Sequence, residues 1–222
     1  MIEQIHEKIQ FYGYFRSSSS YHCRIAFNLK GVRYDFHSVH LKNGAQKSDD
    51  FSALNPQQLL PVLVTKGGAE ITQSLAILEW LEERRPNPAI LPRNSNLRAQ
   101  ERAFSQVIAC EVHPLQNLRV LQYLKAELGA DGAKLDAWLQ RWIGDGLAAC
   151  EGLLQKRDTE FPFCFGKTPG MADICLVPQV FSAQRFGVEI GHRPLISDIY
   201  KRCAEIPAFA EAHPNKQPDY EA

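Results

Sequence analysis

The sequence has no apolar run near the roughly 20 residues that a membrane-spanning helix needs. It also has no excess of charge of either sign, because 25 Lys and Arg balance 25 Asp and Glu in 222 residues. Without a basic surplus the sequence does not predict a nucleic-acid surface. We therefore expect a protein that binds neither membranes nor nucleic acid. The opening segment, MIEQIHEKIQ, is too charged for the apolar region of a signal peptide, so a cytoplasmic location is expected.

Cysteine pairs with redox or metal-binding spacing are missing as well. The six cysteines include no C-x-x-C pair and no zinc-finger spacing. In a chain of this length without an export signal, they are expected to be free thiols in a reducing compartment. The sequence therefore predicts no metal site and no disulfide framework.

The hydrophobic pattern changes near residue 90 and indicates two kinds of domain. Before that point, short alternating runs and helical runs follow one another in the order β-α-β-α-β-β-α. The expected strands lie at 9–14, 34–39, 62–64 and 69–72, and the expected helices at 24–30, 49–54 and 74–85. After a segment rich in Pro and Asn, the expected elements are all helical: 97–124 with a break at His113-Pro114, 133–156, 170–185 and 194–205. The fold class is thus α/β followed by all-α, and the polar tail 213–222 is expected to be loose.

Three short motifs carry candidate chemistry, and each also has a purely structural interpretation. Ser17 to Ser20 precede the first helix, where their hydroxyls either cap the helix or donate to a sulfur and favour its thiolate. Local sequence alone favours capping. Pro61 is either an ordinary edge-strand proline or a cis proline that leaves the Leu60 backbone free to pair with an extended peptide. Ser74 is either a plain helix cap or part of a carboxylate site at a helix N-terminus.

The order of these motifs resembles the zeta class of glutathione transferases, which includes the maleylacetoacetate and maleylpyruvate isomerases. The string from Tyr14 to Ala26 resembles the class signature Arg-Ser-Ser-Cys-x-Trp-Arg-Val-Arg-Ile-Ala. The run from Asn55 to Pro61 resembles Asn-Pro-x-x-x-x-Pro, and Gln73 to Ile77 matches Gln-Ser-Leu-Ala-Ile. The stretch from His113 to Leu121 resembles a segment of the isomerases, and the ending Gln217-Pro218-Asp219 also fits. The resemblance covers nearly the whole chain.

The sequence departs from this class at four positions. Ser19 stands where the class has cysteine, Tyr21 where it has tryptophan, and His22 where it has arginine. The reactive thiol of the class comes from glutathione, so the loss of the cysteine is expected to be tolerated. Gly170 stands where the class has a serine or threonine helix cap, and Asp173 is expected to complete that cap.

The resemblance implies a thioredoxin-like glutathione-binding domain at residues 1–88, a linker at 89–96, an all-helical substrate domain at 97–222, and a homodimer. It implies glutathione as cofactor, with Ser17, Ser18 and Ser19 as the catalytic groups that hold its sulfur as thiolate. The implied glutathione-binding residues are Ser17, Ser18, Ser19, Ser20, Tyr21, Gln46, Leu60, Gln73, Ser74 and Gln116. The implied ligands of a small dicarboxylate substrate are Arg16, His113, Asn117, Arg119 and Arg185.

The implied reaction is a cis-trans isomerisation of a maleyl diacid, such as 4-maleylacetoacetate to 4-fumarylacetoacetate. Thiolate addition turns the cis double bond into a single bond, rotation follows, and elimination returns glutathione. Maleylpyruvate is an alternative substrate. A transferase or dehalogenase of small α-halo acids and a non-catalytic binding protein on the same fold also stay open at this point.

Overall fold

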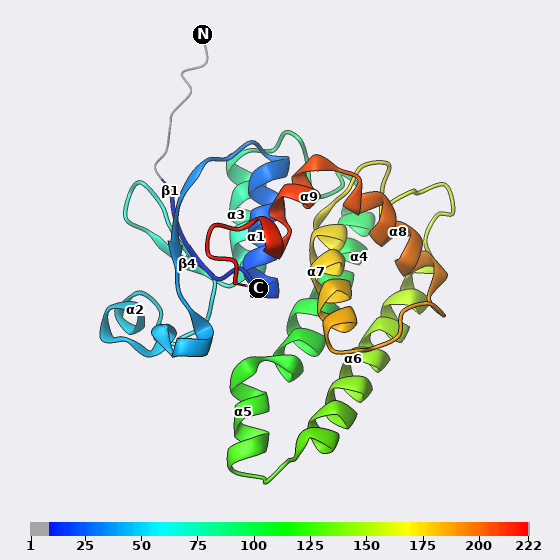
Figure 1. Ribbon diagram of the computed structural model, residues 1–222. Coiled ribbons are helices and arrows are strands. Elements are labelled where there is room, and N and C mark those ends of the chain that lie inside the picture. The colour runs from blue at the N-terminus through cyan, green and yellow to red at the C-terminus, as the bar shows by residue number, and fades with distance from the viewer. Residues whose placement is uncertain (1–8, 222) are drawn as a thin grey trace. The chain divides into compact units, whose positions relative to one another are not determined.

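The computed structural model describes residues 9–221 of the chain. These residues form two compact units, one built from 9–88 together with 207–221 and the other from 89–206 (Figure 1). The sequence placed everything after residue 97 in the second domain. The structure differs, because the C-terminal segment packs with the first unit.

The first unit contains a four-stranded sheet in the order β2-β1-β3-β4. Its strands are β1 (Ile9–Gly13), β2 (Tyr34–Ser38), β3 (Val62–Val64) and β4 (Glu70–Thr72). Strand β1 runs parallel to β2 and antiparallel to β3, and β3 and β4 form the predicted hairpin. Phe11 lies opposite Phe36 on one side and Leu63 on the other, and its ring is fully buried.

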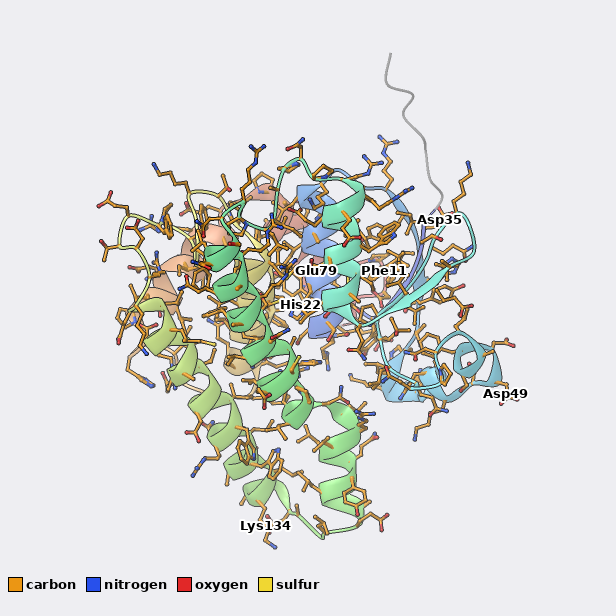
Figure 2. All side chains as sticks on the ribbon, turned by 180° about the vertical axis from the view of Figure 1, so that it is seen from behind. Phe11, His22, Asp35, Asp49, Glu79 and Lys134 are labelled. Atoms are coloured by element: carbon orange, nitrogen blue, oxygen red, sulfur yellow. The ribbon has the colours of Figure 1, made fainter. Side chains whose placement is uncertain are left out.

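Helices α1 (Ser18–Leu29) and α3 (Ser74–Arg84) of this unit pack against each other (Figures 1 and 2). The shorter elements between β2 and β3 are η1 (Leu41–Asn43), η2 (Ala45–Lys47) and α2 (Asp49–Leu54). The predicted order β-α-β-α-β-β-α is confirmed. Helix α1 begins six residues earlier than expected, because Ser17 caps it there. The core of the first unit includes the buried side chains of Phe27, Ile77 and Leu81.

The C-terminal segment is ordered by specific contacts, so the prediction of a loose tail is wrong. It forms α9 (Pro207–Ala212) and η5 (Pro214–Lys216), and α9 lies beside α1 (Figure 1). The Asn28 side chain donates to the carbonyl of Ala208 at 3.0 Å. Further along, Asp219 Oδ2 accepts from the Phe15 N–H at 3.0 Å. These partners lie far apart in the sequence, so no local pattern indicated the packing.

The second unit is helical, and the predicted break at His113-Pro114 is confirmed. A π-helical segment and a 3-10 turn separate the first two α-helices there. The most buried helix is α7, whose apolar side chains form much of the core. Within residues 9–221, no helix combines the length and apolarity needed to span a membrane. The elements are α4 (Ser95–Gln106), η3 (Val107–Val112), η4 (His113–Gln116), α5 (Leu118–Ala126), α6 (Gly132–Leu154), α7 (Met171–Arg185) and α8 (Pro194–Ala204).

Two carboxylates bind the start of α7. Asp173 accepts from the Gly170 N–H at 2.9 Å and from the Cys164 N–H at 3.0 Å, which confirms its expected capping role. The second carboxylate belongs to Glu101 on α4, whose Oε1 accepts from the Ala172 N–H at 3.2 Å. A Cβ atom on Gly170 would lie only 2.0 Å from this oxygen. Glycine therefore occupies the cap position because Glu101 fills the space of a side chain.

Candidate functional site

The serine turn before α1 combines a helix cap with buried hydroxyls. Ser17 Oγ accepts from the Ser20 N–H at 3.2 Å, so the capping interpretation of Ser17 is confirmed. Ser20 Oγ in turn accepts from the Tyr14 N–H at 3.4 Å. Ser18 and Ser19 lie in the first turn of α1 and are 8% and 9% exposed. A hydroxyl that accepts from a helix N–H can still donate its own proton, so capping and anion stabilisation are compatible at this turn.

The backbone leading into the serine turn is fixed by two charged side chains that the sequence analysis did not select. Arg24 donates through one terminal nitrogen to the Tyr14 carbonyl at 3.3 Å and through the other to the Phe15 carbonyl at 3.0 Å. Its Nε donates to the Ala212 carbonyl at 3.0 Å. Asp219 binds the Phe15 N–H from the C-terminal segment. These hydrogen bonds therefore hold the backbone of Tyr14 and Phe15 in place just before the serine turn.

Burial lowers the pKa of Arg24 to about 10, against the raising effect of nearby Tyr34, Tyr21 and Asp219. The guanidinium therefore stays protonated at neutral pH, and all three of its hydrogen bonds are charge-assisted. This explains how a side chain as large as arginine is accommodated among buried residues.

A second polar cluster lies where α3 begins. Ser74 is the first residue of α3 and is 6% exposed, and its Oγ lies 3.1 Å from His22 Nδ1 on α1. Gln73 precedes it with a φ of 69°, in the left-handed region that glutamine rarely adopts, and such strained residues concentrate at functional sites. The Gln73 Nε2 donates to Gln57 Oε1 at 2.9 Å. The sequence analysis noted His22 only as a departure from the class and gave it no role, whereas the structure joins it to the predicted carboxylate site.

Three more predicted glutathione residues lie in the same unit. The peptide bond between Leu60 and Pro61 is cis, as one of the two sequence interpretations required. Gln46 is buried, and its Oε1 has no hydrogen-bond partner within the described part of the chain. A buried acceptor in this state fits a polar ligand that brings a donor. Tyr21 is buried with its ring 5.2 Å from the Arg24 guanidinium carbon.

In the second unit, the predicted residues His113 and Gln116 belong to one polar network. Gln116 and Gln179 exchange a reciprocal pair of amide hydrogen bonds of 2.9 and 3.1 Å. The Gln116 amide nitrogen also lies 3.4 Å from His113 Nδ1. Burial, and to a smaller extent the positive charge of Arg185, together lower the pKa of His113 to about 4. His113 is therefore a neutral imidazole at physiological pH.

The predicted carboxylate ligands are distributed over both units. Arg16 belongs to the first unit, where its guanidinium lies 5.0 Å from the ring of Phe15. Arg119 and Arg185 belong to the second unit and are both exposed on its helices. Asn117 caps α5 by accepting from the Arg119 N–H at 3.1 Å, so its Oδ1 has a structural role. The substrate roles of these residues stay predictions.

The chain's own thiols are poorly suited to act as nucleophiles. Burial raises the pKa of Cys150 to about 12 and raises the pKa values of the other shifted thiols, Cys110, Cys164, Cys175 and Cys203. Cys23 is fully buried in α1. A thiol reaction at the serine turn therefore needs a thiol from a ligand. Across residues 9–221, no group of three or more His, Cys, Asp or Glu side chains could hold a metal ion.

The fold and the site define a glutathione transferase. Residues 16–84 match the family model of the glutathione S-transferase N-terminal domain. A maleylpyruvate isomerase from a Ralstonia species is 45% identical over 95% of this chain and 99% of its own length. A holo structure of maleylpyruvate isomerase, described as a bacterial zeta-class glutathione transferase, is 44% identical with a TM-score of 0.92, covering 96% of this chain and all of that one.

A maleylacetoacetate isomerase from Anaeromyxobacter dehalogenans has been solved with dicarboxyethyl glutathione and citrate in its active site. It is 35% identical to this chain with a TM-score of 0.86, covering 99% of this chain and 96% of its own. These similarities extend over both units and not over the thioredoxin-like part alone. The chain belongs to the zeta-class glutathione transferase family of maleylacetoacetate and maleylpyruvate isomerases.

Proposed function

We propose that this protein catalyses the glutathione-dependent cis-trans isomerisation of a maleyl diacid, either 4-maleylacetoacetate or maleylpyruvate. The observation that carries the proposal is the serine turn at the start of α1, in which Ser18 and Ser19 are buried, in a chain whose own thiols are buried or raised in pKa. The named relatives support it, because they are isomerases of these two substrates and their similarity to this chain extends over nearly its full length.

Residues of the first unit fit glutathione. Ser74 and the free N–H groups of the first turn of α3 suit the γ-glutamyl carboxylate, since a helix N-terminus attracts anions. The buried Gln46 oxygen is an acceptor that needs a donor, and the Leu60 backbone is the predicted partner of the cysteinyl residue. Bound glutathione supplies the thiolate that adds to the substrate double bond and later leaves.

The serines stabilise the negative charge of the glutathione thiolate. Ser17, Ser18 and Ser19 are in the first turn or at the cap of α1, where hydroxyls and the helix dipole both favour an anion. Because Arg24 and Asp219 fix the backbone just before the turn, the donors are oriented before the ligand arrives. The turn thus lowers the pKa of a bound thiol without a general base.

Arginines are the proposed ligands of the two substrate carboxylates. The planar guanidinium of Arg16 or Arg185 can bind both oxygens of one carboxylate, whereas a lysine offers only a point charge. His113, held neutral, can donate or accept a hydrogen bond near the diacid without adding a third positive charge. Dicarboxyethyl glutathione in the solved relative is by its name a glutathione that carries a diacid, which fits a site for both ligands.

The test is a paired assay in which each maleyl substrate is mixed with glutathione and purified protein. We expect catalytic loss of the enone absorbance for one of them, with no net consumption of glutathione. Ser17→Ala should lower kcat by about 10²-fold, as removal of an oriented donor to a developing anion does. Arg185→Ala should raise KM for the diacid by roughly 10-fold to 100-fold, the effect of one charge-assisted hydrogen-bond pair.

Arg185→Lys is the matched control, because it keeps the charge and removes the bidentate fork. It should recover only part of the lost affinity. If neither substrate changes in the presence of glutathione, the proposal is wrong. Release of halide from small α-halo acids under the same conditions would favour the dehalogenase alternative.

We further propose that the protein is a homodimer, as implied by its family. Size-exclusion chromatography with light scattering should give twice the 25.1 kDa chain mass. A monomer at assay concentration would contradict this.

A further inference from the structure

His22 lies against the proposed carboxylate subsite and has no place in the reaction described above. Its side chain comes from α1, which packs against α3 (Figure 2), and it contacts Ser74, the first residue of α3. His22 is 1% exposed, and its Nδ1 lies 3.1 Å from the Ser74 hydroxyl oxygen. The contact is therefore shielded from water.

The chemistry of a carboxylate ligand decides which group donates in this contact. An ionised carboxylate only accepts hydrogen bonds, so the side chain of Ser74 can bind it only by donating a hydrogen bond from its hydroxyl group. The Ser74 oxygen must then act as acceptor toward His22. This requires a proton on His22 Nδ1, directed at Ser74 Oγ.

A histidine proton on Nδ1 also fixes the rotation of the hydroxyl. With one lone pair of Oγ engaged by the ring, the Ser74 proton is held away from His22. Without the ring, the hydroxyl rotates among several directions, and ligand binding has to select one of them. Such orientation before binding raises affinity because less freedom is lost on association.

We propose that His22 is a positioning residue for glutathione, which holds the Ser74 hydroxyl as a donor to the γ-glutamyl carboxylate. The inference rests on the proposed contact between Ser74 and that carboxylate. It assigns to His22 no contact with the ligand and no proton transfer.

The experiment compares two ligands by titration calorimetry on the full chain. One is glutathione, and the other is 4-aminobutanoyl-cysteinyl-glycine, which keeps the amine and lacks only the γ-glutamyl carboxylate. The Kd of the truncated ligand divided by the Kd of glutathione measures the contribution of the carboxylate contact alone. His22→Leu should reduce this ratio about tenfold, which corresponds to about 1.4 kcal/mol, and should leave the Kd of the truncated ligand unchanged.

Two further variants separate positioning from packing. His22→Asn places an amide donor near the position of Nδ1 and should keep most of the ratio. His22→Gln moves the donor further along the side chain and should behave like His22→Leu. This pair keeps the test decisive even if the leucine variant fails to fold.

Ser74→Ala tests the foundation separately. If it leaves the ratio unchanged, Ser74 does not bind the carboxylate, and both the proposed contact and the role of His22 are wrong. If it reduces the ratio while all His22 variants keep the parent value, only the role of His22 is overturned. An equal loss of affinity for both ligands in His22→Leu and His22→Asn would show a packing role and would also overturn it.

Discussion

Replacing Gly170 with serine should destabilise the second unit, although serine is ordinarily the better residue at a helix N-cap. Gly170 has an extended backbone, with φ of −121°, so a side chain is not excluded by its dihedral angles. The obstacle is steric. A Cβ atom would lie 2.0 Å from Glu101 Oε1, 3.0 Å from Glu101 Cδ and 3.1 Å from the Ile90 carbonyl oxygen.

The size of the destabilisation follows from the interactions that are lost when the Glu101 carboxylate is displaced. Glu101 is 3% exposed and accepts from the Ala172 N–H, so moving it removes a hydrogen bond to a charged group. That loss is worth about 1.5–3 kcal/mol, and a buried group left unsatisfied adds about 1–3 kcal/mol. A serine hydroxyl that caps α7 returns about 1 kcal/mol. We expect Gly170→Ser to lower the free energy of unfolding by about 1.5–5 kcal/mol.

The assay is a double-mutant cycle by urea unfolding, followed by circular dichroism at one fixed protein concentration. Glu101→Ala alone should also destabilise, because the Ala172 N–H loses its acceptor. The double variant Gly170→Ser/Glu101→Ala has room for the serine cap and should be more stable than either single variant. Additive losses in the double variant, or a Gly170→Ser protein as stable as the parent, would refute this account of the glycine.

Three other perturbations follow from single contacts. Asp219→Ala leaves the buried Phe15 N–H without its acceptor and should cost about 1–3 kcal/mol of unfolding free energy, measured by urea titration, whereas Asp219→Asn should cost less than half as much. The pKa of His113, measured by NMR, should be about 4 in the folded protein, against 6.5 when unfolded. Because the unfolded state binds the proton more readily, the stability contributed by His113 falls as the pH drops from 6.5 to 4. Arg185→Gln should raise the pKa of His113 only partly, because burial is the larger cause. Lys30→Met removes three hydrogen bonds from a fully buried ammonium and should lower the thermal midpoint by several degrees, with Lys30→Arg unable to restore it.

The sequence analysis located most elements within a few residues. The expected strand at 62–64 and the expected helix at 49–54 have the predicted bounds. The first helix was placed too late, because its opening turn is made of serines, which have no apolar period and lower helix propensity. The sequence analysis missed α9 because this helix is short and begins soon after α8 ends.

The candidate site was predicted from motifs, and its supporting groups were not. Serines, a proline before a strand and a Gln-Ser pair at a helix start are local signals, and the proline has its expected position. The serines are shifted, because Ser18 to Ser20 lie in the first turn of α1 and Ser74 is the first residue of α3, with Gln73 in the cap position expected for Ser74. Arg24 and Asp219 lie within the quoted motifs, but neither motif indicated which backbone groups these side chains bind. Their importance comes from burial and from backbone groups that they bind.

The sequence by itself determined the order of elements and the change from an α/β part to a helical part, since caps and periodicity act over a few neighbouring positions. The candidate residues for binding a tripeptide thiol came from its resemblance to a family and stay predictions. Only the tertiary structure decided which groups support them. The Ser74–His22, Glu101–Ala172 and Phe15–Asp219 pairs are separated by 52, 71 and 204 residues. Such pairs form when packing excludes water and leaves a buried polar group with one partner within reach, and no local pattern specifies that partner.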